Sequence, residues 1–393
     1  MALPGQPTLP PTLHTSSPSS SSSSSFSSPP SFSPLPSLSP LNGSSKHSSK
    51  QNNVLGFAAG HEKWPSELRI PVYSTSEVIE KMRGKLPNKQ VDEHPYRAMY
   101  SSLIGGIILD PTLMVIPIDD HMVHRGHGVF DTALLINGCL YDMDSHLDRF
   151  LKSASAAKIS PPYPRETIKG ILLFLAVASK LKTGSIRYWL SSGPGDFLVS
   201  PPRNSTPTFY SVAIAKEFNR ILEGVKVITT TIPTKPPKFA TMKTVNYLPN
   251  VLSKMEAEEK GAYSSIWVDD QGYVAEGPNC NIAFVSKERE LLLPRPDKIL
   301  FGCTSKRLLI LANKLIGNGI LKSVRTRDIS VEEAKGSAEM MFVSSLIPIM
   351  PVVDWDGKPI GDGNIGEVTR AISDLFWEDI ISGTQMLKTE VTY

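Results

Sequence analysis

Three residues that lie far apart in the chain could do chemistry together. Lys243 lies in FATMKTVNYL, Glu276 ends YVAE before a Pro-Asn turn, and Thr304 lies where GCTSKRLLILANKL begins a helical pattern. A lysine can form a Schiff base with an aldehyde, a carboxylate can keep a pyridine nitrogen protonated, and a helix N-terminus can bind a phosphate. A pyridoxal phosphate site needs all three functions, so this set predicts amino-acid chemistry.

Each of these residues also has an ordinary explanation. Taken alone, Lys243 fits a solvated surface lysine, Glu276 fits an exposed strand end, and Thr304 fits a helix N-cap. Lys235 and Lys238 are competing lysines, but both lie in a proline-rich stretch that is unsuited to rigid placement. The chemical interpretation therefore depends on the order and context of the residues.

The elements that must position these residues follow from the apolar periodicity. Helices are expected at residues 76–86, 144–158, 167–182, 246–260, 304–316 and 366–381. Strands are expected at residues 185–192, 208–215, 225–231, 264–269, 273–276, 281–286 and 290–293. Residues 124–132, HRGHGVFDT, are interpreted as a glycine-punctuated loop before a hairpin at Asn137-Gly138. In the helix at 246–260, Leu248, Leu252 and Met255 are spaced to form one apolar face.

Strands with segregated helices predict an α+β fold, and 393 residues suffice for about two domains. We expect an N-terminal extension at 62–95, a small α/β domain at 96–218 and a large cofactor-binding domain at 219–393. The net charge of +3 gives no case for binding nucleic acid or an acidic membrane surface. Three scattered cysteines argue against a disulfide framework and a zinc site, so no metal is expected. The sequence contains no run of about twenty apolar residues, so no membrane span is expected.

Residues 1–61 differ in composition from the rest of the chain. They contain no Asp or Glu, and serine and proline dominate them, including the run Ser19–Ser25. Such a segment buries too little apolar surface to fold, so it is expected to be disordered. Two interpretations remain, a flexible tail or an organelle transit peptide. Because arginine is scarce, the chloroplast type is favoured over the mitochondrial type and over a cytoplasmic protein.

From about Ala98 to Phe376 the chain resembles the class IV aminotransferases. The matching pieces, in order, are HRGHGVFDT, SHLDRFLKSA, KTVNYLPNVLSKMEAEEKGA, EGPNCNIAFV, FGCTSKR and VDWDGKPIGDGNIGEVTRAI. The resemblance implies a two-domain α/β fold and an obligate homodimer with pyridoxal 5'-phosphate bound between the domains. It also implies the following roles: Lys243 as the Schiff-base lysine and proton carrier, Glu276 as the partner of the pyridine nitrogen, Arg149, Cys303 and Thr304 as phosphate ligands, and Tyr247 as a partner of the cofactor hydroxyl.

The same resemblance narrows the class of substrate that we expect. Phe130 stands where bacterial D-amino acid transaminases have a carboxylate-binding tyrosine, so the bacterial mode of binding the carboxylate is not expected. The resemblance places Phe130, Ser344 and Ser345 against the substrate. The segment RYWLSSGPGDF resembles the subgroup of plant D-amino acid transaminases and aminodeoxychorismate lyases. The expected reaction is therefore transfer of the amino group of a D-amino acid to a 2-oxo acid, pyruvate or 2-oxoglutarate. The alternatives are an aminodeoxychorismate lyase, then a branched-chain aminotransferase. A non-enzymatic scaffold is disfavoured because Lys243 and Glu276 are both present.

Overall fold

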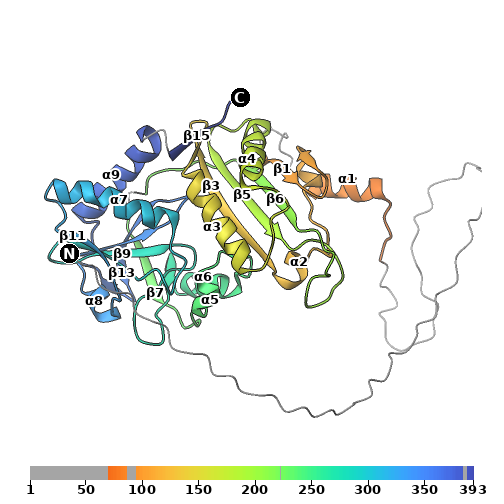
Figure 1. The fold of residues 1–393 in the computed structure, drawn as a ribbon. Coiled ribbons are helices and arrows are strands. Elements are labelled where there is room, and N and C mark those ends of the chain that lie inside the picture. The colour runs from red at the N-terminus through yellow and green to blue at the C-terminus, as the bar shows by residue number, and fades with distance from the viewer. Residues whose placement is uncertain (1–69, 86–93, 222, 384–386) are drawn as a thin grey trace, which may run out of the picture. The chain divides into compact units, whose positions relative to one another are not determined.

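The computed structural model describes residues 70–85, 94–221, 223–383 and 387–393 (Figure 1). Residues 73–393 form one compact unit, and the helix expected at 76–86 is α1 (Thr75–Lys85). The expected leader at 1–61 lies outside the described residues, as does part of the expected extension at 62–95.

The first sheet has seven strands in the order β15-β4-β3-β5-β6-β1-β2, and every neighbouring pair is antiparallel. Its strands are β1 (Tyr96–Ser101), β2 (Gly106–Ile108), β3 (Gly128–Ile136), β4 (Cys139–Tyr141), β5 (Gly184–Ser191), β6 (Thr208–Ile214) and β15 (Lys388–Glu390). Two short helical turns, η2 (Pro111–Leu113) and α2 (His121–Arg125), precede β3. Helices α3 (Met143–Ala156) and α4 (Arg165–Ser179) pack on this sheet, where Phe150 and Leu172 share a core with Ile186.

The second sheet has eight strands, with β11-β10-β9-β12-β13-β7-β8 in order and β14 paired to β13. The strands are β7 (Val225–Thr229), β8 (Ser264–Ile266), β9 (Asn281–Val285), β10 (Glu290–Leu293), β11 (Ser323–Thr326), β12 (Glu339–Val343), β13 (Ile349–Trp355) and β14 (Lys358–Pro359). Helices α7 (Cys303–Gly317) and α9 (Glu367–Ser382) lie side by side (Figure 1) and bury Leu308 and Phe376 against Met341 of β12. The short α8 (Val331–Lys335) contributes Ala334 to a second core with Phe284 and Trp355.

Most predicted elements are confirmed, and so is the α+β fold class. Two predictions are wrong. The segment 124–132 is not all loop, because β3 begins at Gly128 and all nine of its residues are buried. Residues 273–276 form only isolated bridges, through Tyr273 and Val274, and no strand. The domain boundaries at 96–218 and 219–393 stay a prediction, and β15 returns from the end of the chain to the first sheet.

Within the described ranges, no helix is long and apolar enough to cross a membrane. The same part of the chain contains no group of three or more His, Cys, Asp or Glu side chains that could hold a metal ion.

Candidate active site

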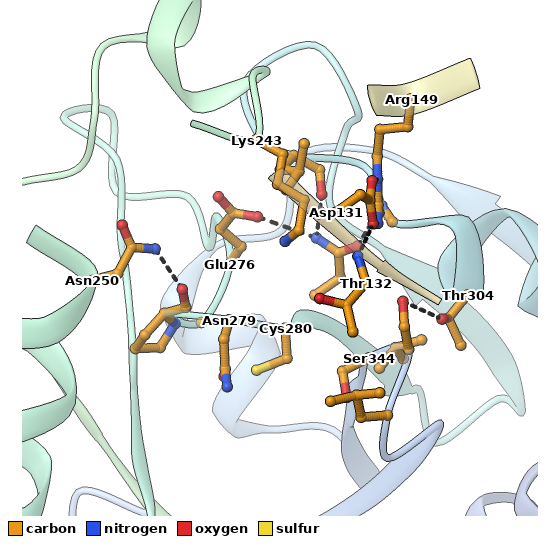
Figure 2. Close-up of a pocket in the computed structure, with 18 of the residues that line it drawn as sticks. Asp131, Thr132, Arg149, Lys243, Asn250, Glu276, Asn279, Cys280, Thr304 and Ser344 are labelled. Atoms are coloured by element: carbon orange, nitrogen blue, oxygen red, sulfur yellow. Dashed lines mark hydrogen bonds and ion pairs between the residues drawn. The ribbon is translucent and has the colours of Figure 1, made fainter. Parts of the chain in front are cut away.

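A cavity of about 150 Å³ is lined by residues of both sheets. Strands β3 and β5 and helix α3 contribute to one part of the lining. The segment 235–250, the segments around β9, the start of α7 and residues 343–346 contribute to the rest. In the view of Figure 2, Glu276 lies toward the left, Arg149 and Thr304 lie toward the right, and Lys243 lies between them. The cavity therefore brings together residues that are up to 216 positions apart, counting from Phe130 to Leu346.

Lys243 lies between the short helix α5 (Pro237–Ala240) and α6 (Leu248–Glu259). Its backbone N–H donates to Ser153 Oγ of α3 at 3.1 Å, and its carbonyl accepts from the Phe130 N–H of β3 at 3.0 Å. These two bonds fix the backbone of a segment that has no regular structure. The Nζ donates to Tyr247 Oη at 3.3 Å and lies 4.8 Å from the centre of the Phe130 ring. The amine is thus held at the cavity without an ion-pair partner in the described residues.

Glu276 is a buried carboxylate, with 7% of its surface exposed. Burial raises its pKa to about 7, although the charges of Lys235 and Lys243 and a backbone hydrogen bond from Leu300 lower it. The Nδ2 of Asn281 donates to Glu276 Oε2 at 3.2 Å. A cationic partner, such as a protonated pyridine nitrogen, would strongly stabilise the ionised form of this buried carboxylate.

Asn281, the first residue of β9, connects Glu276 to the start of α7. Its Oδ1 accepts from the Gly302 N–H at 2.7 Å and from Ser305 Oγ at 2.8 Å. A Cβ at Gly302 would lie 2.7 Å from the same Oδ1, so a larger residue here would displace the Asn281 side chain. Sequence reasoning missed Asn281, although it lies within the EGPNCN motif.

The N-terminus of α7 supplies backbone donors to the cavity. Gly302 is its N-cap residue and offers no side-chain cap, so Thr304 is not the N-cap that the ordinary explanation required. Thr304 lines the cavity, and its Oγ1 donates to Ser345 Oγ at 3.4 Å. Cys303 does not line the cavity with its side chain, which is 1% exposed. A helix of fifteen residues that starts with uncapped N–H groups favours an anion.

Arg149 extends from α3 to the same cavity and pairs with Asp131 of β3. Its Nε donates to Asp131 Oδ2 at 2.8 Å, and its Nη2 donates to Oδ1 at 2.7 Å. Sequence reasoning missed Asp131, which had been assigned to a loop.

Two further cations at the cavity were also missed. Arg187 of β5 donates from Nε to Thr132 Oγ1 at 3.0 Å, and its guanidinium lies 5.3 Å from the Phe130 ring centre. Lys235 lines the cavity despite its proline-rich surroundings, and its Nζ lies 5.4 Å from the Tyr247 ring centre. Among the described residues, neither cation is within ion-pair distance of a carboxylate. No local signal in the sequence distinguishes either one from a surface cation.

The cavity collects most of the predicted site residues: Phe130, Arg149, Lys243, Tyr247, Glu276, Thr304, Ser344 and Ser345. Their individual roles stay predictions. Their chemistry fits pyridoxal phosphate, because an unpaired amine, a buried carboxylate and a helix start with an arginine suit its aldehyde, its ring nitrogen and its phosphate.

Comparison with known proteins gives consistent results. Residues 128–355 match the family model described as Amino-transferase class IV. The chain is 53% identical over 325 residues to the "D-amino-acid transaminase, chloroplastic" of Arabidopsis thaliana, which covers 82% of this chain and 86% of that protein. It is 26% identical over 285 residues to the D-alanine aminotransferase of Bacillus licheniformis, which covers 72% of this chain and 98% of that protein.

A solved structure supports the fold alone. The branched-chain amino acid aminotransferase of Escherichia coli has a TM-score of 0.70 at 21% identity, and the match covers 76% of this chain and 100% of that one.

Proposed function

Because this chain belongs to the class IV aminotransferases, we propose that it transfers the amino group of a D-amino acid to a 2-oxo acid, such as pyruvate or 2-oxoglutarate, with pyridoxal 5'-phosphate as cofactor. The observation that carries the proposal is a single cavity lined by the amine of Lys243, the buried carboxylate of Glu276, Arg149 and the start of α7. The preference for D-amino acids is supported by the names of the Arabidopsis and Bacillus relatives.

The residues of the chain have separate tasks in this proposal. Lys243 attaches the cofactor through its amine and, once freed, moves a proton to and from Cα of the substrate. Glu276 holds the pyridine nitrogen, Arg149 and the N–H groups of α7 at Cys303 and Thr304 hold the phosphate, and Tyr247 is placed against the cofactor hydroxyl. When bound, the cofactor supplies an electron sink for the negative charge that develops at Cα.

Arg187 is assigned to the carboxylate of the substrate. Its guanidinium lines the cavity, and its partners among the described residues are the neutral Thr132 hydroxyl and the Phe130 ring. An arginine in this state has donors left for a planar carboxylate. Phe130, Ser344 and Ser345 also line the cavity, and the proposal assigns them to the rest of the substrate.

The proposal includes a homodimer. Four apolar side chains of α6, at spacings of three and four residues, are exposed: Leu248 (64%), Val251 (48%), Leu252 (41%) and Met255 (47%). A stripe of this kind on a helix is typical of a face that a second chain covers.

The proposal also places the protein in the plastid stroma after removal of a transit peptide. It is supported by the acid-free, serine-rich composition of residues 1–61 and by the chloroplastic Arabidopsis relative.

The experiment that tests the activity is a single-turnover reaction of the yellow, cofactor-loaded protein. D-alanine, L-alanine and L-leucine are mixed with it separately, and the absorbance of the bound cofactor is followed. We expect conversion by D-alanine, reversed by pyruvate or 2-oxoglutarate. Conversion by L-leucine alone would assign the protein to the branched-chain enzymes, and pyruvate release from aminodeoxychorismate without any conversion would assign it to the lyases.

Two lysine variants serve as controls. Lys243→Ala should remove both the colour and the conversion. Lys238→Ala changes an exposed lysine of the same stretch that does not line the cavity, so it should retain both.

A further inference from the structure

Asp131 is a fully buried carboxylate that none of the proposed tasks uses. It lies on β3 with 0% of its surface exposed, and it faces α3. Burial alone would raise its pKa, but the charges of Arg149 and His146 and their hydrogen bonds hold the pKa of Asp131 well below its usual range. The carboxylate is therefore ionised at neutral pH although it has no access to water.

Asp131 is itself held rigidly. Its Oδ1 accepts from the Thr132 N–H at 2.7 Å and lies 2.9 Å from Nδ1 of His146. The same Nδ1 lies 3.2 Å from Nη2 of Arg149, so His146 contacts both the carboxylate and the guanidinium. Strand β3 and helix α3 thus fix both oxygens of one side chain.

This carboxylate fixes the plane of the Arg149 guanidinium. Both hydrogen bonds use one edge of the guanidinium, Nε and Nη2, so the group can neither tilt nor rotate freely. Within the described residues, no hydrogen bond engages Nη1. Figure 2 shows Arg149 meeting Asp131 beside the cavity that Arg149 lines.

We propose that Asp131, supported by His146, is a positioning residue that orients Arg149 toward the phosphate of the cofactor. The inference rests on the proposed function, because it requires a phosphate at the start of α7. Two effects oppose each other here. The negative charge of Asp131 repels a phosphate, whereas its two hydrogen bonds hold the arginine ready for one. Since the Arg149 guanidinium already offsets this charge at contact distance, orientation is expected to dominate.

The test compares two ligands that differ only in the phosphate. Full-length protein is dialysed free of cofactor, and its affinities for pyridoxal phosphate and for pyridoxal are measured by fluorescence titration. The dissociation constant for pyridoxal divided by that for pyridoxal phosphate gives a ratio that reports the phosphate site alone. For Asp131→Asn we expect this ratio to fall by about tenfold to a hundredfold, because a charge-assisted pair is lost, with the affinity for pyridoxal unchanged.

A matched control exists away from the cavity. Asp379 of α9 is buried and accepts from Nε of Arg307 at 2.9 Å and from Nη2 of the same arginine, so it forms the same paired arrangement. None of these atoms lines the cavity. Asp379→Asn should lower thermal stability and leave the phosphate preference unchanged, whereas Arg149→Met should weaken the phosphate preference at least as much as Asp131→Asn does.

The outcomes separate the inference from the function on which it rests. If the unaltered protein binds both ligands equally, the phosphate site itself is wrong. If Arg149→Met weakens the preference for pyridoxal phosphate while Asp131→Asn preserves or strengthens it, only the positioning role is overturned. Should Asp131→Asn fail to fold, Asp131→Glu carries the test, because it keeps the charge but displaces the carboxylate by one methylene. We expect a smaller fall in the ratio for that variant, and an unchanged ratio would overturn the inference.

Discussion

At the scale of single residues, Glu276 carries a free-energy cost that the cofactor is expected to relieve. Burial raises its pKa from the usual 4.5 to about 7, so the folded protein holds this proton more tightly than the unfolded chain does. The contribution of Glu276 to the free energy of unfolding of the cofactor-free protein then falls as the pH rises from about 4.5 to about 7. The full difference corresponds to about 3 kcal/mol.

Replacing Glu276 by Gln should therefore stabilise the cofactor-free protein only at high pH. The stabilisation by Glu276→Gln is the free energy of unfolding of the variant minus that of the unaltered protein. We expect this stabilisation to be about 3 kcal/mol larger at about pH 8 than at about pH 4, because glutamine bears no buried charge. Chemical denaturation of both proteins at the two pH values measures this. The same variant should transaminate slowly. A stability difference that does not change with pH would contradict the assignment.

The residues that sequence reasoning identified are those to which the proposed reaction assigns direct chemistry. Lys243 and Glu276 stand in motifs whose order along the chain resembles that of the class IV aminotransferases. Sequence reasoning did not identify Asp131 and Asn281, because each acts through a hydrogen bond to another side chain. Asp131 bonds Arg149, and Asn281 bonds Glu276. Such pairings arise from strand register and helix packing, which the local pattern of the chain does not specify.

At the scale of elements, α6 shows what a periodic pattern can and cannot predict. The spacing of Leu248, Leu252 and Met255 predicted a helix with an apolar face, and the helix is confirmed. The residues buried within the chain are instead Asn250, Ser253 and Ala257. Periodicity reveals that a face is apolar but not what covers it, so the proposed partner subunit is the occupant that accounts for the exposed stripe.

A charge placed in that stripe should separate the subunits. Leu252→Glu is expected to convert the dimer to a monomer, since the carboxylate would lose its hydration at the interface. Size-exclusion chromatography with light scattering measures the mass. Ile310→Glu, at a residue of α7 that is 59% exposed, is the matched control and should remain dimeric. A dimer that persists in Leu252→Glu would show that α6 lies outside the interface.

At the scale of the whole molecule, the cavity forms because two sheets contribute to its walls. Arg149 and Asp131 belong to the first sheet and its helix, whereas Asn281 and the start of α7 belong to the second. The α+β class was predictable from the separate runs of strands and helices. The return of β15 to β4 was not, because residues 388–390 carry no signal for a partner some 250 residues earlier.

The leader is a matter of the whole chain as well. A fluorescent fusion of the full sequence should accumulate in plastids, and a fusion that lacks residues 1–61 should remain in the cytosol. Fluorescence microscopy of plant cells distinguishes the two. Exclusion of the full-length fusion from plastids would contradict the proposed location without affecting the proposed chemistry.

The central claim is that the amino group of a D-amino acid passes to a 2-oxo acid. The most direct test incubates the protein with 2-oxoglutarate and D-alanine labelled with heavy nitrogen, followed by chiral chromatography and mass spectrometry of the products. The account predicts labelled D-glutamate together with pyruvate in equal amounts. Labelled ammonia, labelled L-glutamate or a complete lack of reaction of D-alanine would each contradict it.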